Sequence, residues 1–395
     1  MSASAVLVAE SASREISFQS LSSLDNINEI VFENESVFRW DPDRIRAVRL
    51  ELIRDAFKLH FHHNEDYRRY CMSFSFSPDQ LVREEDLSRV PRLPSTLFKL
   101  TTVRTCEARE VVKECTSSGT RGSVSRVVRD EKTLGRFFGS VRCALDQVLG
   151  IHDAFCVHLG PSQSKAADLW FSYVMAATEL VFQTAHLMHD RELPTAEAVE
   201  QVRRALREHE HALVIGAPVM FLRVLDYMEQ NGVVIENADR VVVVTAGGWK
   251  RFSGAAIPRP ELHRRLQKQF LGLRDESIRD FFNMVELNTV LPECEYHVKH
   301  VPPWLHVDLF EPTTLRPAKS GELGLLSYLD PTATSYPGFV LTDDFCRVTL
   351  EDGQRCACGR RGPGIDIIRR VNKGESRGCA LKLDHSHVNA GKKSS

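Results

Sequence analysis

Residues 115–123 have the sequence Cys-Thr-Ser-Ser-Gly-Thr-Arg-Gly-Ser, and they follow the β-prone pair Val111-Val112. Glycine lets a backbone come close to a ligand and adopt positive φ angles. Successive N–H groups of such a loop can point into one concavity, and serine and threonine hydroxyls add further donors. This composition is typical of a loop that wraps a phosphate group, although ordinary surface loops often share it. No Gly-Lys-Ser/Thr follows at the Walker spacing, so we expect a different mode of phosphate binding.

Length and composition exclude several classes of protein. The 395 residues are enough for two or three domains, and a content of 43% hydrophobic and 26% charged residues is ordinary for a soluble protein. The net charge of −2 predicts neither a nucleic-acid partner nor an anionic membrane partner. The longest apolar stretch is interrupted by polar residues, and residues 1–14 lack the basic start of a signal peptide. We therefore expect no membrane span and a cytoplasmic location, where the ten cysteines stay reduced.

Strand-like and helix-like segments alternate through the middle of the chain. The expected strands cover residues 155–161, 212–218 and 240–248, and the expected helices cover residues 131–149, 167–189 and 219–231. Such alternation predicts an α/β fold with a parallel sheet that is covered on both faces. Ligands of these sheets bind where strands end in glycine-rich turns.

The ends of the chain have a different character. Residues 1–25 are rich in serine and alanine and are expected to be loose, whereas residues 26–70 are expected to be helical. From about residue 290 to 368, short β-prone runs and prolines predict a smaller β-rich subdomain. We expect one large domain over residues 26–368, followed by a short C-terminal segment over residues 369–395.

Five segments in a fixed order connect this pattern to a known superfamily. They are Thr116–Gly122, Ala246–Lys250, Phe282–Glu286, Tyr336–Gly338 with Thr342–Asp344, and Cys356–Arg360 with Ile367–Val371. In order and spacing they resemble the acyl-adenylate-forming enzymes, in the branch of the phenylacetate-CoA ligases and the LuxE-type acyl-protein synthetases. Gly-Gly-Trp-Lys at 247–250, Glu-Cys-Glu at 293–295, Ser-Tyr-Pro-Gly at 335–338 and Arg-Gly-Cys at 377–379 favour the acyl-protein synthetases. The resemblance covers about residues 30 to 382.

The resemblance implies a large adenylate-forming N-terminal domain that binds ATP and Mg²⁺. It assigns the ATP phosphates to Ser117, Ser118, Gly119, Thr120 and Gly122. It also implies that Gly247 and Gly248 pack along the adenylate. The phosphate loop departs from the superfamily pattern at Arg121 and Ser123, which replace the usual hydroxyl residue and lysine.

The same resemblance assigns roles to three charged residues. Glu286 matches the glutamate that meets Mg²⁺ on the phosphates, and Arg370 matches the arginine of the hinge before the C-terminal part. Asp344 matches the aspartate that accepts hydrogen bonds from the ribose hydroxyls, with the adjacent Asp343 as the alternative. These roles suit the chemistry, because attack of a carboxylate on a phosphate brings two anions together and requires cations and directed donors.

The C-terminal part is expected to be truncated. Residues 371–395 follow Arg370, where complete ligases of the superfamily carry a mobile domain. The lysine that such a domain supplies for adenylation has no assigned counterpart, although Lys373 and Lys382 lie in this region. Truncation of this kind is typical of the acyl-protein synthetases.

Four residues form a candidate zinc site. Cys356-x-Cys358 offers two thiolates beside Gly359, and Cys294-x5-His300 offers two more ligands, as a tetrahedral zinc requires. Cys294-x2-His297 is the alternative pair, and reduced thiols without a metal are the alternative to zinc. Some relatives of phenylacetate ligase hold a structural zinc with this kind of set.

Cys379 stands apart from the other cysteines, because it lies near the end of the chain among glycines and basic residues. Exposure and positive neighbours favour the thiolate. The acyl-protein synthetases acylate themselves on a cysteine near the C-terminus, and Cys379 matches this position.

The expected function is therefore ATP-dependent activation of a carboxylic acid, in particular a fatty acid. The acyl group would then pass to Cys379 and onward to a partner such as an acyl reductase. Two alternatives are an acyl- or aryl-CoA ligase of the phenylacetate type and a non-catalytic binding protein on the same fold. The sequence indicates neither the acid nor the oligomeric state.

Overall fold

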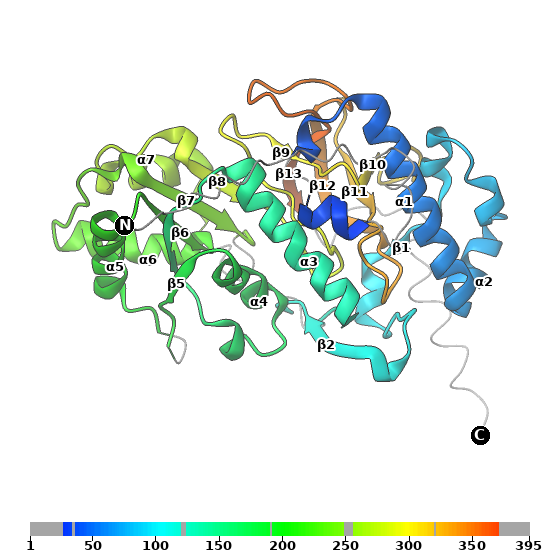
Figure 1. Cartoon of the computed structure of the whole chain (residues 1–395), viewed down its shortest axis with the longest axis horizontal. Coiled ribbons are helices and arrows are strands. Elements are labelled where there is room, and N and C mark those ends of the chain that lie inside the picture. The colour runs from blue at the N-terminus through cyan, green and yellow to red at the C-terminus, as the bar shows by residue number, and fades with distance from the viewer. Residues whose placement is uncertain are drawn as a thin grey trace, which may run out of the picture.

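The computed structural model describes residues 27–33, 36–119, 124–189, 192–248, 256–319 and 321–370. The expected loose segment 1–25 and residues 371–395 of the expected C-terminal segment lie outside these ranges. Two lobes are apparent, one built around a parallel sheet and the other around a largely antiparallel sheet (Figure 1).

A five-stranded parallel sheet forms the first lobe, in the order β5-β4-β6-β7-β8. Its strands are β4 (Ala154–His158), β5 (Gln183–His186), β6 (His211–Gly216), β7 (Val241–Ala246) and β8 (Ile278–Phe281). The apolar, largely β-branched residues of β6 and β7 suit strands that are buried on both faces. The prediction of a covered parallel sheet is therefore confirmed.

Alternate residues of these strands enter two hydrophobic clusters. One face packs against α5 (Thr195–Glu208), α6 (Pro218–Gln230) and α7 (Arg259–Gln269), and its strand members include Val157, Val214 and Val243. The other face packs against α3 (Glu131–Ala144) and α4 (Trp170–Ala176), and its strand members include Cys156, Leu213 and Val244. This alternation follows from the two-residue period of a strand.

The prediction of a helix over residues 167–189 is wrong for the second half of this range. Helix α4 ends at Ala176, a 3₁₀ turn covers Ala177–Leu180, and Gln183–His186 form the edge strand β5 beside β4. A continuous apolar run does not distinguish a helix from a helix followed by a strand. Pairing with β4, which lies far away in sequence, determines the outcome.

A six-stranded sheet forms the second lobe. Its main path is β10-β11-β12-β13-β9, with antiparallel neighbours, and β1 (Leu93–Pro94) joins β12 in parallel. The other strands are β9 (Lys299–His300), β10 (His306–Phe310), β11 (Gly324–Leu329), β12 (Phe339–Leu350) and β13 (Gly364–Arg370). The β-rich character expected after residue 290 is confirmed, but the sheet also recruits a short strand from residues 93–94.

Helices α1 (Pro42–His63) and α2 (Glu65–Ser73) lie over this second lobe (Figure 1). Asp41 is the N-cap of α1, because its carboxylate accepts a hydrogen bond from the Arg44 N–H at 2.9 Å. Pro42 occupies the first turn, where its missing N–H costs no hydrogen bond. Phe57 of α1 packs near Phe339 of β12, with ring centroids 6.4 Å apart. None of the described helices combines the length and the apolar character that crossing a membrane requires.

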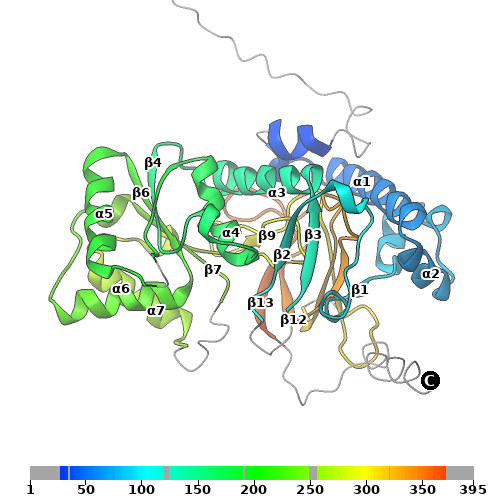
Figure 2. The same ribbon diagram turned by 90° about the horizontal axis from the view of Figure 1, so that it is seen from below.

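The phosphate-loop candidate connects an antiparallel hairpin of β2 (Val111–Thr116) and β3 (Arg126–Asp130). Figure 2 shows this hairpin in the middle of the molecule, between the lobe of the parallel sheet and helices α1 and α2. Its β2 end is tied to the segment before α4, since the Thr116 N–H donates to the Asp168 carbonyl at 2.7 Å. The β-prone pair Val111-Val112 therefore belongs to a strand that leads into the loop, and a second strand follows the loop.

Candidate functional site

The phosphate-loop candidate is closed at its base by two serines. The Ser117 N–H donates to the Ser125 carbonyl at 3.0 Å, and the Ser125 N–H donates to Ser117 Oγ at 2.9 Å. Gly119 has a φ of +61°, and a Cβ there would lie 2.6 Å from Val124 Cγ1. Glycine is thus required at this position by both backbone conformation and space. Ser118 is exposed beside it.

The rest of this loop lies outside the described residues. It comprises Thr120, Arg121, Gly122 and Ser123.

Glu286 lies on a β-turn over Met284–Leu287, within a loop that the Phe282–Leu291 pair closes after β8. Its side chain is buried, and burial raises the pKa of its carboxyl. A hydrogen bond with the Ser125 side chain and the charge of Arg370 act in the opposite direction on this pKa. The structure therefore brings the predicted metal-binding carboxylate to the base of the phosphate-loop candidate.

Asp344 and Arg370 face each other across strands β12 and β13, where they are direct register partners. Arg370 Nε lies 3.2 Å from Asp344 Oδ1, and Arg370 Nη2 lies 3.3 Å from Oδ2. Burial raises the pKa of Asp344, and the Arg370 charge opposes this shift. Each carboxylate oxygen has a second lone pair, so Asp344 can accept further hydrogen bonds while it pairs with Arg370.

Four side chains from separate parts of the chain thus act on one another electrostatically or by hydrogen bonds, and we call them the Glu286 cluster. Its members are Ser125, Glu286, Asp344 and Arg370. Sequence analysis identified the last three but not Ser125, whose contact with Glu286 spans segments far apart in sequence. The cluster combines two buried carboxylates with one guanidinium beside a loop rich in N–H donors, which suits a nucleotide with its metal ion.

The glycine pair lies directly after β7, at the carboxyl edge of the parallel sheet. Gly247 and Gly248 have φ angles of +80° and +58°. A Cβ on Gly247 would lie 2.2 Å from a ring carbon of Phe171, so the backbone here packs directly on that ring. Trp249 and Lys250 lie outside the described residues.

The four residues expected to bind zinc converge. Their ligand atoms all lie within 4.8 Å of one another, with Cys294 Sγ 3.9 Å from Cys356 Sγ and Cys358 Sγ 3.3 Å from His300 Nε2. His300 Nδ1 lies 3.1 Å from the Arg361 carbonyl, which orients the ring and leaves Nε2 for a metal. A hydrogen bond between the Cys294 and Cys358 side chains raises the pKa of Cys294 and lowers the pKa of Cys358. Three sulfurs and one imidazole nitrogen fit a closed tetrahedral zinc site.

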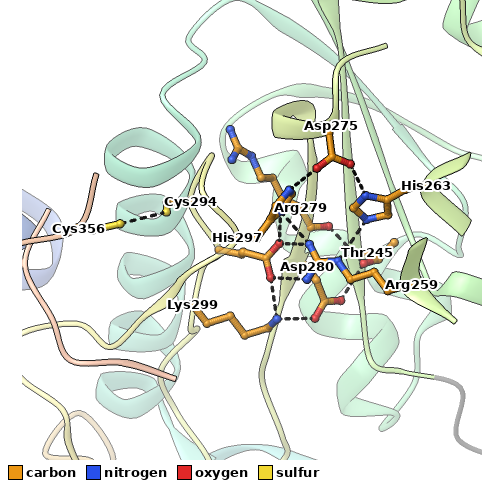
Figure 3. A network of polar contacts seen from close by, with 11 residues as sticks. Thr245, Arg259, His263, Asp275, Arg279, Asp280, Cys294, His297, Lys299 and Cys356 are labelled. Carbon is orange, nitrogen blue, oxygen red and sulfur yellow. Dashed lines mark hydrogen bonds and ion pairs between the residues drawn. The ribbon is translucent and has the colours of Figure 1, made fainter. Parts of the chain in front are cut away.

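The alternative ligand His297 lies in a different group. Its Nε2 is 2.8 Å from Asp275 Oδ2, and its Nδ1 is 3.1 Å from Glu293 Oε1 (Figure 3). His263 Nδ1 approaches the other oxygen of Asp275 at 2.6 Å. Arg259 contacts both imidazoles, at 3.2 and 2.9 Å. A fixed cation against both rings opposes binding of a metal ion there, so the structure favours His300 over His297.

A buried lysine connects the segment that carries two residues of the candidate zinc site to the parallel sheet. Lys299 Nζ lies 2.8 Å from Glu293 Oε2 and 2.9 Å from Asp280 Oδ2, and Thr245 donates to Asp280 Oδ1 at 2.7 Å (Figure 3). Glu293 and Lys299 are the sequence neighbours of Cys294 and His300, whereas Thr245 lies two residues before Gly247. Sequence analysis missed this network, because a single buried lysine has no local pattern.

The predicted acyl acceptor Cys379 lies outside the described residues.

Similarity to known proteins extends over most of this chain. The family model described as "Acyl-protein synthetase, LuxE" matches residues 12–387. The long-chain-fatty-acid–luciferin-component ligase of Aliivibrio fischeri is 33% identical over 359 residues, which cover 90% of this chain and 93% of that protein. The ligase of the same name from Vibrio harveyi is 33% identical over 350 residues, which cover 88% of this chain and 90% of that protein.

A solved structure shares the fold. An open conformation of 2-hydroxyisobutyryl-CoA ligase, in complex with 2-HIB-AMP and CoA, matches with a TM-score of 0.63 and 16% sequence identity. The match covers 85% of this chain and 77% of that one. The similarity confirms the adenylate-forming fold that the sequence predicted.

Proposed function

The chain belongs to the LuxE family of acyl-protein synthetases and is a ligase, and on this premise we propose that it activates a long-chain fatty acid with ATP. The acyl-adenylate then reacts with Cys379, which carries the acyl group to a partner such as an acyl reductase. The observation that carries this proposal is the Glu286 cluster, which lies at the base of the phosphate-loop candidate.

In the adenylation step, a carboxylate oxygen of the fatty acid bonds to the α-phosphorus of ATP, and pyrophosphate leaves. Two anions must approach each other, so the site has to offset negative charge. When bound, Mg²⁺ supplies part of that charge, and the buried Glu286 carboxylate is a suitable oxygen ligand for it. N–H groups and hydroxyls of residues 117–122 hold the phosphates.

The ribose is held by Asp344. A ribose diol offers two donors, and a carboxylate is their natural acceptor. The ion pair with Arg370 fixes the orientation of the Asp344 carboxylate before the nucleotide arrives. Gly247 and Gly248 let the backbone after β7 pack along the adenylate without a side chain in the way.

In the transfer step, the Cys379 thiolate bonds to the acyl carbon, and the bond from that carbon to the phosphate oxygen breaks. AMP leaves, and the thiol proton passes to solvent. The product is a thioester on the protein itself. A reactive thiol of this kind requires reducing conditions, so a cytoplasmic location is part of the proposal.

Intact-protein mass spectrometry tests the transfer directly. The protein is incubated with a long-chain fatty acid, ATP and Mg²⁺, and we expect a mass increase equal to one acyl group that hydroxylamine removes. Omitting ATP is the control. Formation of acyl-CoA after addition of coenzyme A, with no adduct on the protein, would instead support a CoA ligase.

We also propose that Cys294, His300, Cys356 and Cys358 hold a structural zinc ion. Freshly purified protein is then expected to contain about one equivalent of zinc, because a closed tetrahedral site holds a single ion. Cys356→Ser should lose the metal and melt at a lower temperature, since the binding free energy of a structural metal adds to the stability of the fold. Elemental analysis and thermal unfolding measure the two effects.

Cys346→Ser is the matched control, because Cys346 is a buried cysteine of β12 that does not belong to the candidate zinc site. We expect this variant to keep its zinc whatever its melting temperature. Absence of metal from the freshly purified wild type would rule out the zinc site.

A further inference from the structure

We propose that Arg129 is a positioning residue of the adenylation site, which fixes the turn that carries Glu286. The inference rests on the proposed role of Glu286 and extends it to a residue of the hairpin. Arg129 belongs to β3, four residues after Ser125, and its side chain is fully buried.

The hydrogen bonds of Arg129 bracket Glu286 in the sequence. Arg129 Nη2 donates to the Val285 carbonyl at 2.7 Å, and Arg129 Nε donates to Asn288 Oδ1 at 3.0 Å. Asn288 is itself fixed, because its N–H donates to Asp330 Oδ2 at 3.0 Å and its amide donates to the Thr133 carbonyl at 2.8 Å. The guanidinium therefore holds the backbone just before Glu286 and the Asn288 side chain just after it.

Core packing alone does not account for a charge at this position. Within the described part of the chain, no carboxylate forms an ion pair with Arg129, whose further hydrogen bonds reach the Tyr336 hydroxyl at 3.5 Å and the Cys115 thiol. The guanidinium carbon lies 3.6 Å from the centroid of the Trp170 ring, so an aromatic face contacts the buried cation. Burying a cation carries a desolvation cost that an apolar residue of similar volume would avoid. The hydrogen bonds to the turn are what an apolar residue could not provide.

Other side chains hold the same turn from its remaining sides. Tyr336 donates from its hydroxyl to the Glu286 carbonyl at 3.2 Å. Asn283 donates from Nδ2 to the Leu287 carbonyl at 2.9 Å and accepts from Trp170 Nε1 at 2.7 Å. Three successive carbonyls, from residues 285 to 287, thus accept from side chains, and Arg129 is the donor that comes from the phosphate-loop hairpin.

Strand β3 therefore acts on Glu286 at two points. Arg129 holds the backbone at Val285, and Ser125, just before the strand, is the side chain whose hydrogen bonding opposes the rise in the pKa of Glu286. This arrangement fixes the distance between the phosphate-loop candidate and the carboxylate that is proposed to meet Mg²⁺. Side chains that orient a metal ligand in this way affect metal affinity without touching the metal.

The test compares Arg129→Met, Arg129→Lys and Arg136→Met in acid-dependent ATP–pyrophosphate exchange over a range of Mg²⁺ concentrations. Arg136 of α3 is an equally buried arginine, but its Nε donates to Asn28 instead of the Glu286 turn. Arg129→Met should raise the Mg²⁺ concentration for half-maximal exchange by about tenfold, the effect expected when an orienting partner of a metal ligand is lost. Arg129→Lys, which keeps one donor near the Val285 carbonyl, should restore part of this affinity.

A purely structural role for Arg129 predicts a different result. Both methionine variants would then lower the melting temperature and leave the Mg²⁺ dependence of the folded fraction at its wild-type value, which would overturn the proposal. A second measurement adds Arg129→Met to Glu286→Gln. If Arg129 acts through Glu286, the added substitution leaves the residual exchange and its Mg²⁺ dependence unchanged. A further tenfold loss in the double variant would contradict the inference, whereas wild-type protein without any exchange would refute the proposed function itself.

Discussion

Glu286→Gln is expected to lower acid-dependent pyrophosphate exchange by about 10²–10³-fold, the effect typical of losing one electrostatic contact to a transition state. The amide keeps the size of the side chain but removes the negative charge that binds Mg²⁺ beside the phosphates. Exchange measured with labelled pyrophosphate at saturating acid and ATP gives the loss directly.

Stability at neutral pH is the control for this variant. Burial raises the pKa of Glu286 in the folded state, so ionisation lowers the stability as the pH rises through the unfolded and then the folded pKa. Glutamine removes this penalty, and Glu286→Gln should therefore melt no lower than wild type at neutral pH. A well-folded variant with undiminished exchange would reject the assignment of Glu286.

Cys379→Ser is expected to abolish the hydroxylamine-labile acyl adduct while leaving pyrophosphate exchange at the wild-type level. Adenylation and transfer are separate half-reactions, and the thiolate takes part only in the second. Intact mass and exchange, measured on the same preparation, separate the two effects.

Cys106→Ser is the matched control, because Cys106 is a partly exposed cysteine outside the zinc cluster. This variant should still form the adduct. A thioester on Cys379→Ser at the wild-type level would mean that another residue accepts the acyl group.

Local patterns were sufficient to predict the three central strands of the parallel sheet. Strands β4, β6 and β7 are short apolar runs of the kind that a buried parallel sheet contains. Each run can be recognised from a few consecutive residues, without knowledge of distant contacts. Strand β5 was missed, since its pairing with β4 depends on contacts that no local window contains. The same holds for β1, which joins a sheet whose other strands lie more than two hundred residues later.

The candidate site divides in a similar way. Resemblance to a family identified Glu286, Asp344 and Arg370, and the structure brings these three together. Neither the hydrogen bond between Ser125 and Glu286 nor the hydrogen bonds from Arg129 to Val285 and Asn288 could be found from the sequence, because they join segments more than one hundred and fifty residues apart. The choice between His297 and His300 also needed the structure, as both spacings from Cys294 suit a zinc ligand.

Pyrophosphate exchange across a panel of acids tests the central claim, activation of a long-chain fatty acid by ATP. The panel should contain fatty acids of increasing length, phenylacetate and amino acids, each with and without Mg²⁺. We predict exchange that requires Mg²⁺ and is fastest with long-chain fatty acids. Exchange with aryl or amino acids alone, or no exchange with any acid, would contradict the account.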